Sequence, residues 1–333
     1  MPQQNPQILL ARRPDGEPTP DCFELRETPI PEPGPGEVLV RHGWLSLDPY
    51  MRGRMSAAKS YAKPVEVGAV MEGQCVGTVE TSEHPGFAPG DQVVGGSGWQ
   101  GWSAVPGERL VKLPPGLDQP SLALGILGMP GLTAYLGMEE IGQPKPGETV
   151  VVSAATGAVG GVVGQLAKLA GARAVGVAGG AEKCRFAEQE LGYAACIDHR
   201  AGDLGAALDL ACPEGIDVYF ENVGGAVQRA VFPRLRDFAR MVMCGMVAEY
   251  SDRERQPGPN LMDCVRKRLR IQGFIVSDQF NRMGEWQAKA LPLIKEGRLR
   301  YREDVVRGLE NAPAAFMGLL RGENFGKLVV EIN

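Results

Sequence analysis

The sequence predicts an α/β fold in which a β-rich domain precedes a doubly wound parallel sheet, and two observations lead to this prediction. In the first part of the chain, short β-branched runs are separated by proline and glycine, as in PEPGPGE at 31–37. From Gly128 onward, buried strand patterns alternate with helix patterns. We therefore expect one domain formed by residues 1–127 together with 300–333, and a second domain at 128–299.

The β-rich domain contains four strand candidates, at 37–42, 75–80, 91–94 and 102–105. Their lengths and the turn residues between them fit a small barrel or sandwich. The run from Leu45 to Met55 has neither helical nor strand periodicity. Because it carries Asp48, Tyr50 and two arginines, it is either a loop that lines a pocket or a structural turn capped by Asp48 with solvated arginines.

The second domain begins with a helix at 129–141, where Pro130 stands near the helix start. The six strands expected in its sheet are 150–152, 172–178, 195–197, 216–221, 238–244 and 269–276. Between them we expect a helix that begins at the glycine-rich turn and continues through 165–170, and helices at 181–191, 203–211, 225–235 and 260–267. A helix at 279–296 follows, and the tail, with a helix at 312–320 and a strand at 328–332, is expected to return to the first domain.

The turn after the first of these strands has the glycine pattern of a dinucleotide-binding site. It lies in the stretch ETVVVSAATGAVGGVVG at 148–164, where a β-branched strand runs through glycines into a helix. Gly157 allows the backbone to approach a pyrophosphate, and Gly160 and Gly164 allow the helix to pack closely on the strand. Ala154 stands where the first glycine of such a motif often lies. Glycine-rich turns also occur for packing alone, but the strand at 172–178 completes the βαβ unit that a dinucleotide site requires.

The end of the second strand selects the cofactor. An NAD site usually places Asp or Glu about 20 residues past the glycines, where it bonds the ribose 2′-hydroxyl. This chain instead has AGGAEK at 178–183, so small residues precede Lys183. A neutral tip and one ammonium would accept a 2′-phosphate, and a tenfold preference requires only about 1.4 kcal/mol. The sequence therefore predicts NADPH, the alternative being that Lys183 is an ordinary solvated lysine.

Composition and charge narrow the class of protein. The 333 residues are 44% hydrophobic and 23% charged, as in soluble globular proteins, and are enough for two domains. A net charge of −5 without basic blocks argues against nucleic acid or an anionic membrane as a partner. The first residues, MPQQNPQILLARR, lack the apolar core of a signal peptide.

Cysteine and histidine usage indicates a cytoplasmic protein without a structural metal. The seven cysteines are odd in number and never form a C-x-x-C pair. Only three histidines are present, at 42, 84 and 199. The sequence therefore offers few cysteine and histidine residues that could bind zinc, and few histidines that could form a catalytic triad.

Seven stretches together are typical of one known family, and they lie in order from Ser46 to Lys327. They are SLDPYMRGRM, GMPGLTAY, SAATGAVGGVVGQLAKLAG, GGAEKCRF, ENVGG, RIQGF and NFGK. On these motifs the chain resembles the zinc-independent medium-chain reductases, specifically the prostaglandin reductase and leukotriene B4 12-hydroxydehydrogenase group with its plant double-bond reductases. The resemblance implies a Rossmann NADP-binding domain at 128–299 and a GroES-like β-rich catalytic domain at 1–127 and 300–333. It also implies a homodimer that pairs at the edge of the sixth strand.

The same resemblance implies contacts with the cofactor. At the pyrophosphate these would come from Ala158, Val159, Gly160 and Gly161, and at the 2′-phosphate from Lys183. Further contacts are implied from Asn222, Cys244, Gly245, Met246, Tyr250, Phe274, Ile275, Val276 and Asn324. Most of these follow predicted strands, where ligands of doubly wound sheets bind. His199 stands where relatives often have tyrosine near the adenosine phosphate, so a contact there would be sensitive to pH.

Two departures from related patterns bear on the mechanism. Where zinc-dependent members of the superfamily have a catalytic cysteine and a Gly-His-Glu motif, this chain has Asp48-Pro49 and Met71-Glu72-Gly73, so we expect no metal. Several eukaryotic relatives have a tyrosine, thought to stabilise the enolate with the nicotinamide ribose, at the position of Arg266. Arg266 is either a cationic substitute or a surface residue of its helix, and we favour the second interpretation. Tyr50 is the next candidate donor, and the alternative is that the 2′-hydroxyl of the nicotinamide ribose suffices.

The function that the resemblance implies is that of an NADPH-dependent 2-alkenal/enone reductase. Hydride would add to the β-carbon of a small α,β-unsaturated carbonyl substrate, and the protein would position the reactants and stabilise the enolate oxygen. A quinone oxidoreductase is the alternative among enzymes. A protein that binds NADPH without turnover, as a redox sensor, is the alternative from another class, and the sequence does not identify the natural substrate.

Overall fold

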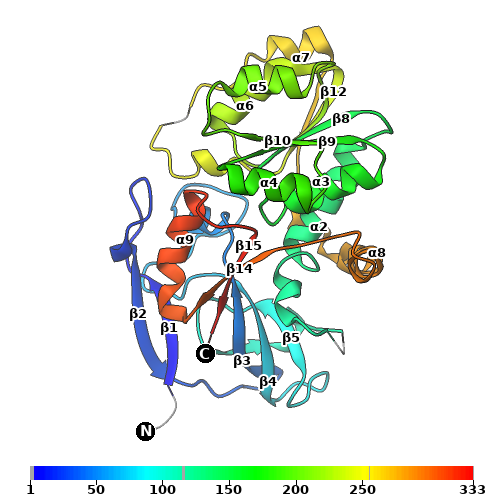
Figure 1. Ribbon diagram of the computed structural model, residues 1–333. Coiled ribbons are helices and arrows are strands. Elements are labelled where there is room, and N and C mark those ends of the chain that lie inside the picture. The colour runs from blue at the N-terminus through cyan, green and yellow to red at the C-terminus, as the bar shows by residue number, and fades with distance from the viewer. Residues whose placement is uncertain (1–3, 115–116, 255, 333) are drawn as a thin grey trace. The chain divides into compact units, whose positions relative to one another are not determined.

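The computed structural model describes residues 4–114, 117–254 and 256–332. The expected domain ranges also contain residues 1–3, 115–116, 255 and 333, which lie outside the described residues. The chain divides into two compact units, one formed by Met1–Gly125, Glu303–Asn324 and Leu328–Asn333, the other by Ile126–Arg302 and Phe325–Lys327 (Figure 1). Over the described residues, neither unit has a helix with the length and apolar composition that crossing a membrane would require.

The first unit is built on a mainly antiparallel seven-stranded sheet with the order β14-β15-β3-β4-β5-β7, in which β6 also pairs with β3. These strands are β3 (Glu37–Ser46), β4 (Gln74–Ser82), β5 (Gln92–Gly96), β6 (Trp102–Pro106), β7 (Leu110–Lys112), β14 (Glu303–Arg307) and β15 (Lys327–Glu331). A separate two-stranded ribbon contains β1 (Gln4–Leu10) and β2 (Phe23–Pro29). The four strands expected from the sequence are present as β3 to β6.

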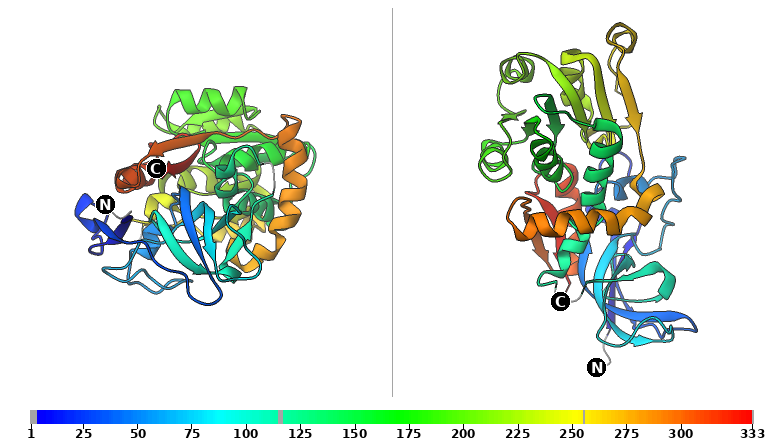
Figure 2. Two further views of the ribbon diagram at one scale, coloured as in Figure 1. Left: turned by 90° about the horizontal axis from the view of Figure 1, so that it is seen from below. Right: turned by 90° about the vertical axis from the view of Figure 1, so that its right-hand side faces the viewer.

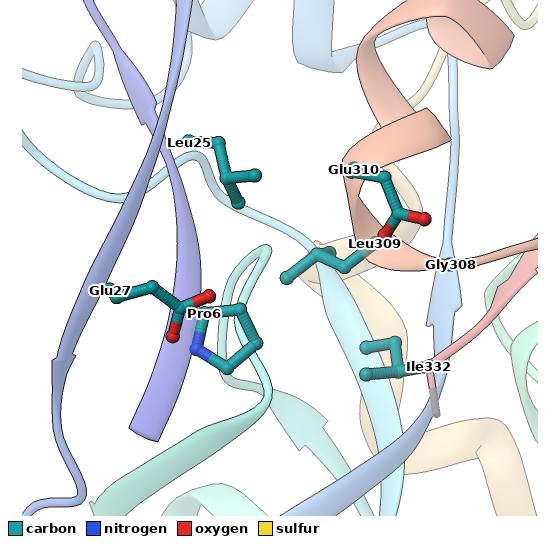
Figure 3. A pocket seen from close by; sticks show the side chains of 7 residues that line it. All are labelled: Pro6, Leu25, Glu27, Gly308, Leu309, Glu310 and Ile332. Atoms are coloured by element: carbon teal, nitrogen blue, oxygen red, sulfur yellow. The ribbon is translucent and has the colours of Figure 1, made fainter.

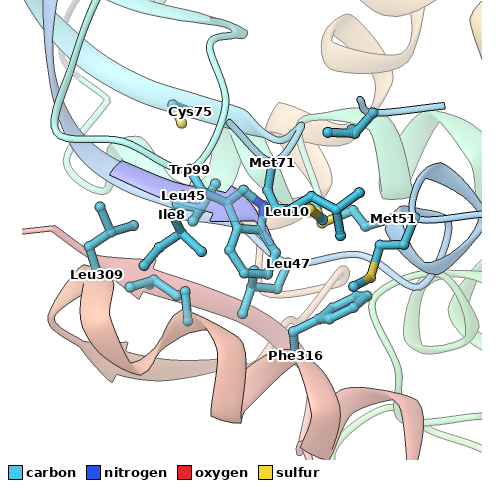
Figure 4. Packing of buried hydrophobic residues seen from close by; sticks show 14 of the residues in the cluster. Ile8, Leu10, Leu45, Leu47, Met51, Met71, Cys75, Trp99, Leu309 and Phe316 are labelled. Atoms are coloured by element: carbon cyan, nitrogen blue, oxygen red, sulfur yellow. The ribbon is translucent and has the colours of Figure 1, made fainter. Parts of the chain in front are cut away.

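An apolar core joins the tail of the chain to its beginning within this unit. Helix α9 (Ala312–Leu320) places Phe316 against Trp99, with ring centroids 5.6 Å apart and nearly perpendicular rings. Phe23 of β2 stacks on Trp99 at 5.8 Å. Figure 4 shows Phe316 and Trp99 together with buried residues of β1, β3 and the short helix α1 (Met51–Arg54). Burial of these aromatic rings with the aliphatic side chains around them stabilises this part of the unit.

The second unit has a six-stranded parallel sheet with the order β10-β9-β8-β11-β12-β13. Its strands are β8 (Thr149–Ser153), β9 (Arg173–Ala178), β10 (Ala195–Asp198), β11 (Ile216–Glu221), β12 (Leu235–Met243) and β13 (Arg270–Gly273). Its helices include α2 (Met129–Leu136), α3 (Gly160–Leu169), α4 (Ala181–Gln189), α5 (Leu204–Ala211), α6 (Gly225–Val231), α7 (Met262–Lys267) and α8 (Met283–Lys295). Helices cover both faces of the sheet (Figures 1 and 2), which confirms the doubly wound fold.

The bounds of several predicted elements differ from those observed. β12 begins at Leu235 instead of 238, and α8 begins at Met283 instead of 279. The helix expected at 129–141 is α-helical only to Leu136 and continues as a π-helical turn at Gly137–Gly142. The helix expected at 225–235 ends at Val231, because Pro233 has no N–H for an α-helical hydrogen bond, and β12 already begins at Leu235. The strand expected at 269–276 ends at Gly273.

Candidate cofactor site

The turn between β8 and α3 is shaped for close approach of a ligand to the backbone. Ala154 adopts the left-handed conformation, with φ of 51°, in which glycine is more usual. A Cβ atom on Gly160 would lie 2.2 Å from the carbonyl oxygen of Ala154, and one on Gly164 would lie 2.1 Å from Cζ of Tyr193. The hydroxyl of Tyr193 donates to the carbonyl oxygen of Gly160 at 2.7 Å. Only glycine therefore allows α3 to start so close to the strand.

The backbone donors at this helix start differ in their availability. The N–H of Gly161 donates to the carbonyl oxygen of Gly157 at 2.9 Å. Among the described residues, the N–H groups of Ala158, Val159 and Gly160 have no protein acceptor. Free N–H groups at a helix start bind anions, so three of the four predicted pyrophosphate contacts have a donor to offer. The site therefore fits the diphosphate of a dinucleotide.

A buried carboxylate at the end of β11 organises the next part of the site. Glu221 is fully buried, and its Oε2 accepts a hydrogen bond from the hydroxyl of Tyr219 at 2.6 Å. Its Oε1 accepts from the hydroxyl of Ser153 at 2.8 Å and from the backbone N–H groups of Val223 and Gly224 at 2.7 and 3.0 Å. Four donors thus compensate for burial of the carboxylate, which holds the loop after β11 in place.

The same network joins three strand ends. The side-chain amide of Asn222 donates to the carbonyl oxygen of Ser153 at 2.8 Å. The backbone N–H groups of Cys244 and Gly245, which follow β12, both donate to the carbonyl oxygen of Glu221 at 3.0 Å. Asn222, Cys244 and Gly245, all predicted contacts, are therefore brought together at the carboxyl edge of the sheet. Ser153 and Glu221 were not predicted, although Glu221 belongs to the ENVGG motif.

The remaining predicted residues after β12 and β13 continue this edge. The hydroxyl of Tyr250 would lie 2.9 Å from a Cβ atom on Gly245, and it accepts a hydrogen bond from the N–H of Met246 at 3.4 Å. Met243 pairs with Gly273, so Phe274 leaves β13 beside the end of β12. Ile275 follows, and Val276 begins the 3-10 helix Val276–Arg282. Burial raises the pKa of the Cys244 thiol to about 12, so this side chain is a neutral part of the edge.

Lys183 and His199 lie near the end of β9. Lys183 is in the first turn of α4, and the N–H of His199 donates to the carbonyl oxygen of Ala178 at 3.0 Å. Burial and then the nearby charge of Arg200 lower the pKa of His199, and Lys183 acts in the same direction. A positive environment of this kind favours a bound anion.

Two predicted site residues, Tyr50 and Asn324, belong to the first unit. Burial and then the Asp48 carboxylate raise the pKa of Tyr50, so its hydroxyl is a neutral donor. The guanidinium of Arg54 lies 5.3 Å from the ring centroid of Tyr50 and 4.8 Å from that of Tyr61. Arg52 and Arg54 are buried, so the interpretation of this loop as a turn with solvated arginines is wrong. Asn324 lies in the turn before β15.

Arg266 is a surface residue of α7. Its side chain is 68% exposed and pairs with Asp263 at 2.9 Å. Among the described residues no group of three or more His, Cys, Asp and Glu side chains is arranged to hold a metal ion. A cavity of about 240 Å³ in the first unit is lined by Pro6, Leu25, Glu27, Gly308, Leu309, Glu310 and Ile332 (Figure 3). None of the predicted site residues lines it.

Comparison with known proteins identifies the family. Residues 6–113 match the model described as the N-terminal domain of oxidoreductase, and residues 158–296 match the one described as zinc-binding dehydrogenase. The chain is 51% identical to the NADPH-dependent curcumin reductase of Escherichia coli, over 99% of this chain and 97% of that protein. It is 40% identical to the NADP⁺-dependent 2-alkenal reductase of Nicotiana tabacum, over 99% and 98% of the two chains.

A solved structure of a related protein has the same fold as this chain. The crystal structure of CurA from Vibrio vulnificus in complex with NADPH is 50% identical to this chain, with a TM-score of 0.94 over 98% of this chain and 99% of the other. Likeness at this level over nearly the whole of both chains reflects common descent. Together with the motifs from Ser46 to Lys327, it establishes that the chain belongs to the zinc-independent medium-chain reductases, the family that includes the prostaglandin and 2-alkenal reductases.

Proposed function

We propose that this protein is an NADPH-dependent reductase of the carbon–carbon double bond in α,β-unsaturated ketones and aldehydes. The observation that carries the proposal is the carboxyl edge of the parallel sheet, where a glycine turn with free N–H groups and a strand end, AGG at 178–180, with no carboxylate of its own suit a phosphorylated dinucleotide. The names of the relatives support the substrate class, because curcumin and 2-alkenals both contain a conjugated carbonyl group.

Each part of the chain has a role in this proposal. The N–H groups of Ala158 to Gly160 bind the pyrophosphate, and Lys183 binds the 2′-phosphate. Glu221 fixes Asn222 and the residues after β12, which position the nicotinamide end. When bound, NADPH supplies the hydride that reduces the β-carbon of the substrate.

The donor for the developing oxyanion is proposed to be Tyr50. Its phenol is neutral at pH 7 with the ordinary pKa of about 10, and it stays neutral over a wider range of pH because burial and the Asp48 carboxylate raise its pKa. A neutral donor positioned in advance stabilises charge that appears on the carbonyl oxygen only during the reaction. Arg266 does not take the place of the missing tyrosine, because its guanidinium is exposed and paired with Asp263.

We also propose that the protein is a homodimer that pairs through β13. This strand ends the six-stranded sheet, so one side of its backbone has no partner strand among the described residues. Nearby apolar side chains are exposed, namely Leu261, Met262, Val265 and Ile271. Light scattering is expected to give the mass of a dimer for the native protein and of a monomer for Val265→Glu/Ile271→Glu. Native protein that is monomeric at micromolar concentration would contradict this proposal.

The test of the enzymatic proposal is the loss of NADPH absorbance with a medium-chain 2-alkenone and with a quinone in parallel. EDTA is present throughout, and NADH is the control cofactor. We expect consumption with the enone that chelation does not affect and that is much slower with NADH. Turnover of the quinone alone, with semiquinone detected, would instead indicate a quinone oxidoreductase, and binding of NADPH without turnover of either would indicate a redox sensor.

A further inference from the structure

A second cation lies at the tip of β9, where the cofactor is selected. A Cβ atom on Gly179 would come within 2.9 Å of Nε and 3.0 Å of Cζ of Arg200. The same atom would lie 3.0 Å from Nε2 of His199. The guanidinium and the imidazole therefore both lie against Gly179, and the absence of a side chain at this position leaves room for them.

The turn after β10 places Arg200 there. Oδ1 of Asp198 accepts hydrogen bonds from the N–H of Gly180 at 2.8 Å and from the N–H of Arg200 at 3.0 Å. The carboxylate nearest in sequence thus binds the backbone rather than the guanidinium. Within the described part of the chain, the exposed side chain of Arg200 forms no hydrogen bond or ion pair. A guanidinium in this position has its donors available for a ligand.

The charges around this point come from two elements. Lys183 is contributed by α4, and Asp198, His199 and Arg200 by the end of β10 and the turn that follows it. Arg200 and Lys183 both lower the pKa of His199, whereas Asp198 raises it, so the two cations act on the same imidazole. A dianion placed between them would interact favourably with both.

We propose that Arg200 binds the 2′-phosphate of NADPH, so that the choice of cofactor depends on Lys183 and Arg200 together. The inference rests on NADPH as the cofactor, as proposed above. A planar guanidinium can give a phosphate two parallel N–H donors, which a lysine cannot do. In this arrangement Gly179 is also a specificity residue, because a larger side chain there would displace the guanidinium.

The test is calorimetric titration of the protein with 2′,5′-ADP and with 5′-AMP, which differ only in the 2′-phosphate. The variants are Arg200→Gln and Arg200→Lys. Arg298→Gln, which changes an exposed arginine paired with Glu296, is the control for net charge. We expect Arg200→Gln to weaken binding of 2′,5′-ADP about 10- to 100-fold and to leave binding of 5′-AMP unchanged, with an intermediate loss for Arg200→Lys.

Two results would overturn the assignment. Equal weakening of both nucleotides by Arg200→Gln would show a contact with the adenosine rather than the phosphate, and unchanged affinity for 2′,5′-ADP would show no contact. Circular dichroism of each variant checks that it is folded. Because the readout is binding, native protein that binds 2′,5′-ADP through Arg200 but reduces no enone would refute the proposed reaction and leave this inference standing.

Discussion

Replacement of Glu221 is expected to show that one buried carboxylate holds the carboxyl edge of the sheet together. In Glu221→Met, a side chain of similar length leaves the N–H groups of Val223 and Gly224 without their acceptor. Each unpaired buried donor costs about 1–3 kcal/mol, so the free energy of unfolding should fall by about 2–6 kcal/mol. The hydroxyls of Ser153 and Tyr219 can rotate, and we assign them no further loss.

Two milder variants provide the comparison. In Glu221→Gln, the amide oxygen can keep the three bonds of Oε1, so we expect a loss of about 1–2 kcal/mol from the missing charge. Tyr219→Phe removes one hydrogen bond and should cost about 1 kcal/mol. Urea unfolding of the full-length proteins gives these values, and titration with NADPH should show weaker binding in the same order.

The test is the order of the free energies of unfolding of these variants. If Glu221→Met is within 1 kcal/mol of the native protein, or if Tyr219→Phe is as destabilising, the backbone donors do not depend on the carboxylate in the way described. Weaker NADPH binding without a change in stability would also contradict the argument, because it would separate the site from the network that supports it.

Three further predictions follow from the same geometry. Gly160→Ala should abolish NADPH binding, because its Cβ would lie 2.2 Å from the carbonyl oxygen of Ala154. Gly284→Ala, where a Cβ atom meets nothing within 4 Å, should leave NADPH binding intact, and equal affinities of the two variants for NADPH would refute this prediction. Calorimetry from pH 8 to 6.5, where the 2′-phosphate stays mainly a dianion, should show that 2′,5′-ADP binds more tightly as pH falls, because the phosphate favours the protonated form of His199. This gain in affinity should be absent in His199→Tyr, and its persistence there would exclude His199 as the cause. Burial lowers the pKa of His42 to about 4, whereas the pKa of histidine in the unfolded chain is about 6.5. As pH falls below 6.5, the unfolded chain therefore takes up a proton first, and the free energy of unfolding of the first unit should fall by about 3 kcal/mol between pH 7 and 4 for this reason. Urea unfolding should show that this contribution is absent in His42→Gln.

The sequence was sufficient for most of the second unit because its signals are local. Buried parallel strands are continuous apolar runs, so Val150–Val152 marks the centre of β8, and glycines mark the turns. Parallel topology then brings the carboxyl ends to one edge, which is why Asn222 and Cys244 could be predicted as neighbours. β2 was missed, because most of its residues are exposed and it has no apolar alternation.

The parts of the site that could not be predicted depend on contacts between distant residues. Glu221 is surrounded by Ser153, 68 positions earlier, and by backbone donors of its own loop. In sequence it is one glutamate among many. The position of Arg200 against Gly179 likewise follows from how the turn after β10 packs on β9, which no local pattern encodes.

The place of β15 in the first sheet has a consequence for the order in which the protein is made. β15 lies between β14 and β3, and β3 is synthesised before the whole of the second unit. Among the described residues of β3, only 44–46 pair with β15, because β6 pairs with residues 37–41. During translation, this end of β3 therefore has an unpaired edge until residues 327–331 emerge, while the second unit can already complete its own sheet. The β-rich unit should thus be the last to fold and the more dependent on chaperones, because an exposed strand edge is open to association with other chains.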